Sequence, residues 1–180
     1  GQTCSALTRM FVPKDRHDEA ARLAKKAAEK FSVGDPFDGE ARLGPLVSAV
    51  QRDRVRRYIE RGVEEGATLV TGGAEPPEGI DRGFFVRPTV FADVRNDMAI
   101  AQEEIFGPVL TVFKARDLDE AIELANSVEF GLSSSIYTRD VTQAFRYADQ
   151  VEAGIVHINA STLGGEVHLP FGGMKASGTG

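Results

Sequence analysis

The sequence predicts an α/β fold in which a mostly parallel sheet is flanked by helices. The main observation is an alternation of strand-like and helix-like segments, joined by short connections, over the last eighty or so residues of the chain. Strand, helix, strand, helix, strand in this order forms a βαβαβ unit, and such crossovers join parallel strands. A second observation is composition: 42% hydrophobic and 27% charged residues are typical of soluble globular domains, so the chain can bury a sizeable core.

The elements of this unit follow from β-propensity and from the spacing of apolar residues. The expected strands are 109–114, 132–138 and 154–158, and the expected helices are 117–126 and 140–150. Asp117 and Glu120 match a capping box at the start of the first helix. The face that we expect the second helix to bury consists of Val141, Ala144, Phe145 and Ala148.

The preceding part of the chain is predicted to hold two amphipathic helices and two further strands. In order, these are a helix over 16–31, a helix from Ser48 to about Glu65, and strands over 68–71 and 84–90. Ser48 is expected to cap its helix, and Pro88 indicates an edge strand or an irregularity. The inward faces are predicted to be Ala20, Leu23, Ala24, Ala27, Ala28 and Phe31 in the first helix, and Val55, Tyr58, Ile59 and Val63 in the second.

Charge and composition bound the classes of partner. The net charge of −6 gives no support to nucleic acid or an acidic membrane as partner. No apolar run approaches the roughly 20 residues that span a bilayer, and the first residues lack a signal-peptide pattern. A single cysteine excludes an intramolecular disulfide framework and suits a reducing compartment, so we expect a cytoplasmic protein. The abrupt ends at Gly1 and Gly180 are interpreted as cuts out of a longer protein.

Cys4 is the candidate nucleophile. It precedes Ala6, Leu7 and Met10, whose spacing predicts the start of a helix. A helix start would favour the thiolate through its dipole, and its free N–H groups would stabilise an oxyanion formed when the thiolate attacks an electrophilic carbon. Because a lone cysteine is more often an inert buried residue, other parts of the chain must decide its role.

Five segments resemble motifs of the aldehyde dehydrogenase superfamily. They are GQTC at 1–4 (family GQxC), EEIFGPV at 103–109, FGLS at 130–133 (YGLxx), GIVHIN at 154–159 (GxVxxN) and PFGGMKASGTG at 170–180 (PFGGxKxSGxG). The segments occur in the family's order, and the resemblance covers essentially the whole chain. One such motif is modest evidence, whereas five in the right order are hard to obtain by chance.

The resemblance implies oxidation of an aldehyde to a carboxylic acid with NAD or NADP. Cys4 would attack the aldehyde to form a thiohemiacetal, whose hydride passes to the nicotinamide, and the resulting thioester would be hydrolysed. Glu104 maps onto the carboxylate that accepts hydrogen bonds from the nicotinamide ribose hydroxyls, a task suited to an acidic side chain. Phe106 maps onto the aromatic residue that packs beside the nicotinamide.

Three further residues are expected to contact the substrate. Asn159 ends a strand at the carboxyl edge, where sites form in α/β sheets, and by resemblance Phe171 lies near the aldehyde entrance. His168, with Glu166, lies in the family's variable substrate loop, 160–169, and is expected to contact substrate, since the family's general base is a glutamate from elsewhere. No histidine has metal-ligand spacing, so no metal is expected. Gly172, Gly173, Gly178 and Gly180 are interpreted as positions of positive φ or close backbone approach.

The resemblance also implies that residues 1–180 are the nucleophile-bearing catalytic domain only. The family's ELGG-type base, the oxyanion-hole amide and most of the cofactor fold would lie upstream, and an assembly strand would follow. We therefore expect no meaningful turnover from the isolated chain, and a parent enzyme that is a homodimer or homotetramer. A CoA-acylating enzyme and a non-enzymatic structural or binding member stay open as alternatives, as do the aldehyde and the choice between NAD and NADP.

Overall fold

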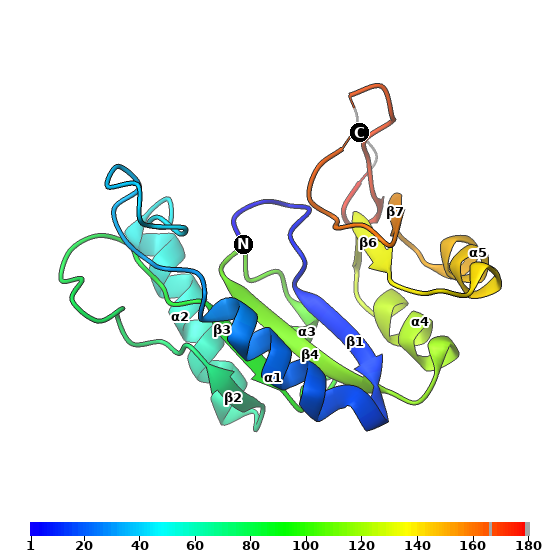
Figure 1. Cartoon of the computed structure of the whole chain (residues 1–180), viewed down its shortest axis with the longest axis horizontal. Helices are drawn as coiled ribbons and strands as arrows, with labels where there is room; N and C mark the ends of the chain where they lie inside the picture. The colour runs from blue at the N-terminus through cyan, green and yellow to red at the C-terminus, as the bar shows by residue number, and fades with distance from the viewer. Residues whose placement is uncertain (166, 179–180) are drawn as a thin grey trace. The chain divides into compact units, whose positions relative to one another are not determined.

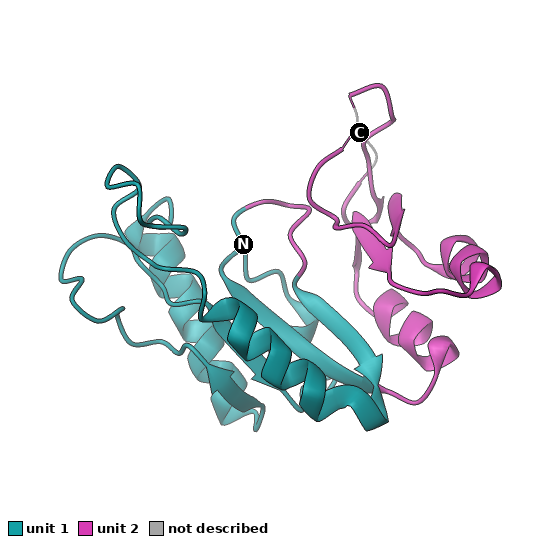
Figure 2. Cartoon of the chain, viewed as in Figure 1, with its two compact units in different colours: residues 1–2, 8–114 teal, residues 3–7, 115–180 magenta. Residues whose placement is uncertain are grey.

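The computed structural model describes residues 1–165 and 167–178, which fold into two compact units (Figure 2). Unit 1 comprises residues 1–2 and 8–114, and unit 2 comprises residues 3–7 and 115–180. Each unit combines helices with strands, and each contains a parallel strand pair, so the predicted α/β class is confirmed. Within the described part of the chain, none of the helices combines the length and apolar character that a membrane span requires.

Unit 1 is built on a four-stranded sheet with the order β1-β4-β3-β2 (Figure 1). The strands are β1 (Arg9–Pro13), β2 (Thr68–Thr71), β3 (Thr89–Ala92) and β4 (Val109–Ala115). β3 pairs in parallel with β4, with Thr89 opposite Val109, and antiparallel with β2. All four residues of β3 are buried, because this strand lies inside the sheet and is covered on both faces.

β3 begins five residues later than the strand predicted over 84–90, which is a correction. Pro88 has no backbone N–H and cannot donate to a sheet ladder. The pairing therefore starts at Thr89, whose N–H donates to the carbonyl of Pro108 at 2.8 Å. The irregularity expected at Pro88 is thus the boundary of the strand.

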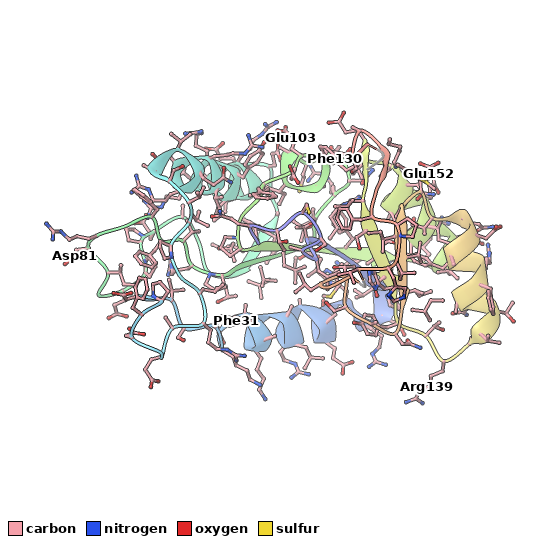
Figure 3. The ribbon with its side chains drawn as sticks, turned by 90° about the horizontal axis from the view of Figure 1, so that it is seen from above. Phe31, Asp81, Glu103, Phe130, Arg139 and Glu152 are labelled. Atoms are coloured by element: carbon pink, nitrogen blue, oxygen red, sulfur yellow. The ribbon has the colours of Figure 1, made fainter. Side chains whose placement is uncertain are left out.

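Three α-helices cover the sheet of unit 1. They are α1 (His17–Ala28), which follows the short 3-10 helix η1 (Lys14–Arg16), α2 (Ala49–Glu64) and α3 (Ala99–Gln102). α1 lies on one face of the sheet and α2 on the other, as both views show (Figures 1 and 3). Val55 and Ile59 of α2 join Phe91 and Phe113 of the sheet in the main core. Ser48 caps α2 as predicted, since its hydroxyl accepts from the N–H of Gln51 at 3.2 Å.

The buried face of α1 differs from the prediction. His17 and Ala21 are buried, whereas Leu23 is 50% exposed and Phe31, beyond the helix end, is 43% exposed. The buried His17 accepts a hydrogen bond from the N–H of Asp93 at 3.4 Å, and an alanine-rich helix offers little hydrophobic contrast for choosing its inward side. In α2 the predicted Val55 and Ile59 are buried, but Val63 is 49% exposed.

In its described residues, unit 2 contains two small sheets and two helices. The antiparallel pair is β5 (Phe130–Gly131) with β8 (Met174–Lys175), the parallel pair is β6 (Ser133–Ile136) with β7 (Ile155–Ile158), and the helices are α4 (Leu118–Asn126) and α5 (Val141–Gln150). α5 forms the crossover between β6 and β7. Asp117 caps α4 by accepting from the N–H of Glu120 at 2.9 Å, and Asp140 caps α5. Ile122 and Tyr147 lie in the core of this unit.

Two features of the predicted βαβαβ unit differ in the structure. Its elements are all present, but β4 belongs to the sheet of unit 1, whereas β6 and β7 pair with each other in unit 2. The predicted face of α5 is also wrong in part. Ala144 is buried together with Tyr147, whereas Val141 is 66% and Phe145 70% exposed. Ala144 belongs both to the predicted face and to the face that the structure buries, so the spacing of apolar residues alone cannot choose between the two faces.

Candidate functional site

Cys4 lies in a turn and its side chain is exposed. The N–H of Ala6 donates to the carbonyl of Thr3 at 3.0 Å, which closes the turn around the thiol. We call residues 3–7 the nucleophile turn. A helix start at this position was predicted and is wrong, so the argument from a helix dipole does not apply to Cys4.

The sheet explains why no helix forms after Cys4. The carbonyl of Thr8 accepts a hydrogen bond from the N–H of Thr111 in β4 at 2.9 Å, and Thr111 Oγ1 donates to the same carbonyl at 2.9 Å. Met10, which was read as part of a helical face, is a residue of β1. Pairing with β4 therefore overrides the weak helical pattern, as tertiary contacts often do.

Glu104 and Phe106 lie in unit 1 on the segment between α3 and β4. Ile105 between them is buried, which leaves the Glu104 side chain exposed and the Phe106 ring half-buried. Phe106 has a φ of 57°, in the left-handed region that a bulky side chain seldom adopts. Such a conformation costs about 1–3 kcal/mol and persists only where the surroundings hold it.

Side chains of α2 hold the backbone of this segment. Gln51 Nε2 donates to the carbonyls of Ile105 at 3.1 Å and Phe106 at 2.8 Å, and Arg54 donates to the carbonyl of Glu104 at 2.6 Å. Three consecutive carbonyls are therefore bound by one helix face. The sequence analysis did not identify Gln51 and Arg54. The only sign of their role in the sequence was that both lie on the predicted helix next to its buried residue Val55.

The side chain of the neighbouring Glu103 contacts the same helix, and its label lies beside α2 in Figure 3. The Tyr58 hydroxyl donates to Glu103, and the Arg61 guanidinium lies 3.5 Å from the other carboxylate oxygen. Burial raises the pKa of Tyr58 above its usual range, and the Glu103 carboxylate raises this pKa further. Glu103 therefore anchors the segment to α2, while the adjacent Glu104 carboxylate faces solvent.

Close packing continues at the end of the motif. Gly107 is buried, and a Cβ placed on it would lie 2.5 Å from Cγ2 and 2.8 Å from Cγ1 of Val55. Gly1 in turn approaches the carbonyl of Gly107 so closely that a side chain there would collide with it. Glycine at both positions is thus required by the approach of other atoms.

Asn159 directly follows β7, and both the oxygen and the nitrogen of its side-chain amide are hydrogen-bonded. Its Oδ1 accepts from the N–H of Thr138 at 2.9 Å, and its Nδ2 donates to the carbonyl of Thr138 at 2.9 Å. The backbone of Asn159 has a φ of 55°, which asparagine tolerates better than most residues. The amide thereby extends the β6–β7 pairing and fixes the start of the loop that follows. A contact between Asn159 and substrate stays a prediction.

The other residues predicted to meet substrate are exposed in unit 2. His168 is exposed, and Phe171 is 58% exposed. Glu166, named with them, lies outside the described residues. A pocket between α2 and the segment around Asp81, labelled in Figure 3, is lined by none of the predicted site residues. Within residues 1–165 and 167–178, no group of three or more His, Cys, Asp or Glu side chains is arranged to hold a metal ion.

Two glycines of the last motif, Gly173 and Gly178, behave as interpreted from the sequence. A Cβ on Gly173 would lie 2.6 Å from the Cβ of Ser177, and Gly178 has a φ of 75°. The carbonyl of Gly172 is approached closely by Gly154. Gly180 lies outside the described residues.

The arrangement is that of a thiol in a turn and, in the other unit, a carboxylate and an aromatic ring on a braced segment. The model of the aldehyde dehydrogenase family matches residues 1–180. This chain belongs to the aldehyde dehydrogenase family. The predicted resemblance is therefore confirmed over the whole sequence.

Similar members of the family are known from sequence and structure. A betaine aldehyde dehydrogenase of Rhizobium etli is 49% identical over 180 residues, which are 100% of this chain and 37% of that protein. A crystal structure of a Mycobacterium tuberculosis aldehyde dehydrogenase complexed with NAD⁺ has a TM-score of 0.94 and 45% identity. A mutant of aldehyde dehydrogenase C from Pseudomonas syringae, complexed with NAD⁺ and octanal, has a TM-score of 0.96 and 42% identity. Each structural match covers 100% of this aldehyde dehydrogenase chain and 37% of the other chain.

Proposed function

We propose that these residues provide the nucleophile and the nicotinamide-facing segment of an NAD(P)-dependent aldehyde dehydrogenase that oxidises an aldehyde to a carboxylic acid. The observation that carries this proposal is the exposed thiol of Cys4, the only cysteine in the sequence, in the turn that opens the family match. The NAD⁺ bound by two similar enzymes supports the choice of cofactor. The chain spans 37% of the length of the relatives described above, so the activity is that proposed for the complete enzyme.

In this reaction Cys4 acts as a thiolate. Its sulfur forms a bond with the aldehyde carbon, the carbonyl electron pair moves to oxygen, and a tetrahedral thiohemiacetal alkoxide results. When the carbonyl re-forms, the carbon expels a hydride, and a nicotinamide cofactor supplies the acceptor for it. Water then displaces sulfur from the thioester, which releases the acid and returns the thiolate. An exposed turn suits this cycle because the aldehyde and then water must both reach one sulfur atom.

Glu104 and Phe106 are the residues that would hold the nicotinamide half of the cofactor. The exposed Glu104 carboxylate can accept hydrogen bonds from two neighbouring ribose hydroxyls. The half-buried Phe106 ring offers an apolar surface, and the bonds from Gln51 keep its backbone in one conformation. The residues present thus fit a nicotinamide riboside, and their role is to orient it.

The substrate is proposed only as an aldehyde. The names of the relatives include betaine aldehyde and octanal, which differ in charge and in apolar length. We assign the choice of substrate to the segment from Asn159 to Phe171, including His168. Assembly as a homodimer or homotetramer, expected from the resemblance, and a cytoplasmic location, expected from the single cysteine, form part of the same proposal.

The test is a kinetic and mass-spectrometric comparison in the complete enzyme. With an aldehyde and NAD⁺ or NADP⁺, acid quenching should trap an acyl adduct on the peptide that contains Cys4. Cys4→Ala should lower turnover by at least about 10³-fold while cofactor binding is kept, as expected for loss of a nucleophile. Glu104→Gln, which removes a charged acceptor, should instead raise the KM for the cofactor by about tenfold. Turnover at the wild-type rate by Cys4→Ala would sink the proposal.

A further inference from the structure

We propose that Thr162 is a positioning residue that holds the nucleophile turn, residues 3–7, in place by binding it to the substrate loop that follows Asn159. The hydroxyl Oγ1 of Thr162 donates a hydrogen bond to the carbonyl of Ser5 at 2.6 Å, and Ser5 is the residue that follows Cys4. The inference rests on the proposed function in so far as Cys4 is the nucleophile. It adds a link between the loop that selects the substrate and the atom that attacks it.

Burial singles Thr162 out within an exposed loop. Thr162 is 2% exposed, whereas the side chains before and after it face solvent and Leu163 is 58% exposed. A buried hydroxyl must find a partner or lose free energy, and here the partner is the Ser5 carbonyl. Among the described residues of this loop, the one buried polar side chain is therefore directed at the nucleophile turn.

The position of the turn within the fold gives independent support. Residues 3–7 belong to unit 2, although residues 1–2 and 8–114 on both sides of them belong to unit 1 (Figure 2). The nucleophile turn thus leaves the unit of its chain neighbours and packs with residues 115–180. The bond from Thr162 lies within unit 2 and joins the turn to it.

The strands of unit 2 fix the origin of this bond. The Asn159 amide is paired with Thr138, and Ser135 Oγ donates to the carbonyl of Ala160 at 2.6 Å. Ser161 Oγ accepts from the N–H of Leu163 at 3.2 Å, which shapes the chain around Thr162. The ends of β6 and β7 therefore fix the position of the Thr162 hydroxyl, and that hydroxyl fixes the position of the backbone next to Cys4.

The expected consequence concerns turnover. A reacting atom must be held close to its attack geometry, and a misplacement of about 1 Å can lower a rate by about 10²-fold. Loss of the bond to Ser5 should therefore lower kcat, whereas the cofactor KM, which depends on other residues, should stay unchanged.

The first test is hydrogen–deuterium exchange of the complete enzyme. Thr162→Val keeps the shape of the side chain and removes the hydroxyl, so the amide of Ala6, which closes the nucleophile turn, should exchange about two- to tenfold faster, as expected for one lost hydrogen bond. Thr162→Ser should restore the wild-type exchange rate. Thr89→Val is the matched control, because Thr89 is 1% exposed and its hydroxyl also donates to a backbone carbonyl, that of Arg87, but within unit 1 and without a bond to the segment around Cys4.

The second test is kinetics of the complete enzyme, where Thr162→Val should lower kcat by about ten- to a hundredfold without changing the cofactor KM, and Thr162→Ser should recover it. Exchange of the Ala6 amide at the wild-type rate in Thr162→Val would overturn the proposal. So would equal acceleration by Thr89→Val, because the effect would then be general destabilisation. Failure of the proposed function gives a different result, namely turnover by Cys4→Ala, and leaves the exchange test decisive for Thr162.

Discussion

Substitution of Gly107 by alanine should destabilise the fold through a collision with Val55. The added Cβ would lie 2.5 Å, 2.8 Å and 3.2 Å from Cγ2, Cγ1 and Cβ of Val55, whose side chain is fully buried. The branched valine has one main rotamer in a helix, so its methyl groups cannot swing away. The φ of Gly107 is not positive, and alanine there would be free of backbone strain. The whole effect is therefore steric.

The magnitude follows from known costs of overpacking and of cavities. An extra methyl group in a packed core costs about 1–3 kcal/mol, so Gly107→Ala should lower the free energy of unfolding by about 2 kcal/mol. Val55→Ala leaves a cavity and should also cost about 2 kcal/mol. In the double variant the new methyl group occupies the space that Val55 vacates. Its cost should therefore be smaller than the sum of the two single costs by about 1 kcal/mol or more.

The assay is urea denaturation of the wild-type chain, both single variants and the double variant, with thermal midpoints as a second measure. In a chain of this size, 1 kcal/mol corresponds to about 2–4 °C in the midpoint. Gly165→Ala serves as the control, because a Cβ there meets no atom within 4 Å and the residue has no positive φ. Additive costs, or a Gly107→Ala variant as stable as wild type, would refute the steric explanation.

Three further variants test other contacts of unit 1. Gln51→Leu removes both donors to the Ile105 and Phe106 carbonyls and should raise the cofactor KM of the complete enzyme about tenfold with a smaller change in kcat, measured by initial rates. Ser48→Ala should lower the free energy of unfolding by about 1 kcal/mol, and Ser48→Asp, which keeps a capping oxygen, should not. Hydrogen bonds, foremost from Lys114, hold the pKa of Asp93 below its usual range. At pH values above its unfolded pKa of about 3.9, this partly exposed carboxylate therefore stabilises the fold by about 0.5 kcal/mol. The stabilisation is lost as the pH falls through the lower pKa of the folded state. Urea titrations should show a deficit for Asp93→Asn at pH 7 that narrows below about pH 4, and an unchanged deficit at pH 2 would contradict the assignment.

Local signals in the sequence were sufficient where the physical cause is local. Ser48 and Asp117 each precede a helix, and each accepts a hydrogen bond from the first turn, because capping depends on residues about three positions away. Gly173 and Gly178 were likewise recognised from the motif that contains them.

Features that depend on distant partners could not be predicted. The turn at Cys4 follows from pairing between Thr8 and β4, about a hundred residues away, and its apolar neighbours gave the wrong helical pattern. The bracing of the Glu104 segment by Gln51 depends on how α2 packs, and an isolated glutamine carries no such signal. For Cys4, Glu104 and Phe106 the sequence motifs supplied a chemical role, whereas the contacts that hold them became visible only in the fold.

The left-handed backbone at motif positions has a consequence for protein engineering. Phe106 and Lys175 have φ values of 57° and 55°, where glycine would relieve strain at no steric cost. At Phe106 glycine would remove a half-buried aromatic ring, and at Lys175 it would remove the amine that donates to the Asn126 carbonyl at 2.9 Å and pairs with Glu152 at 3.0 Å. Libraries built on this chain should keep Phe106 fixed, because a gain in melting temperature there would come with the loss of the ring proposed to face the nicotinamide.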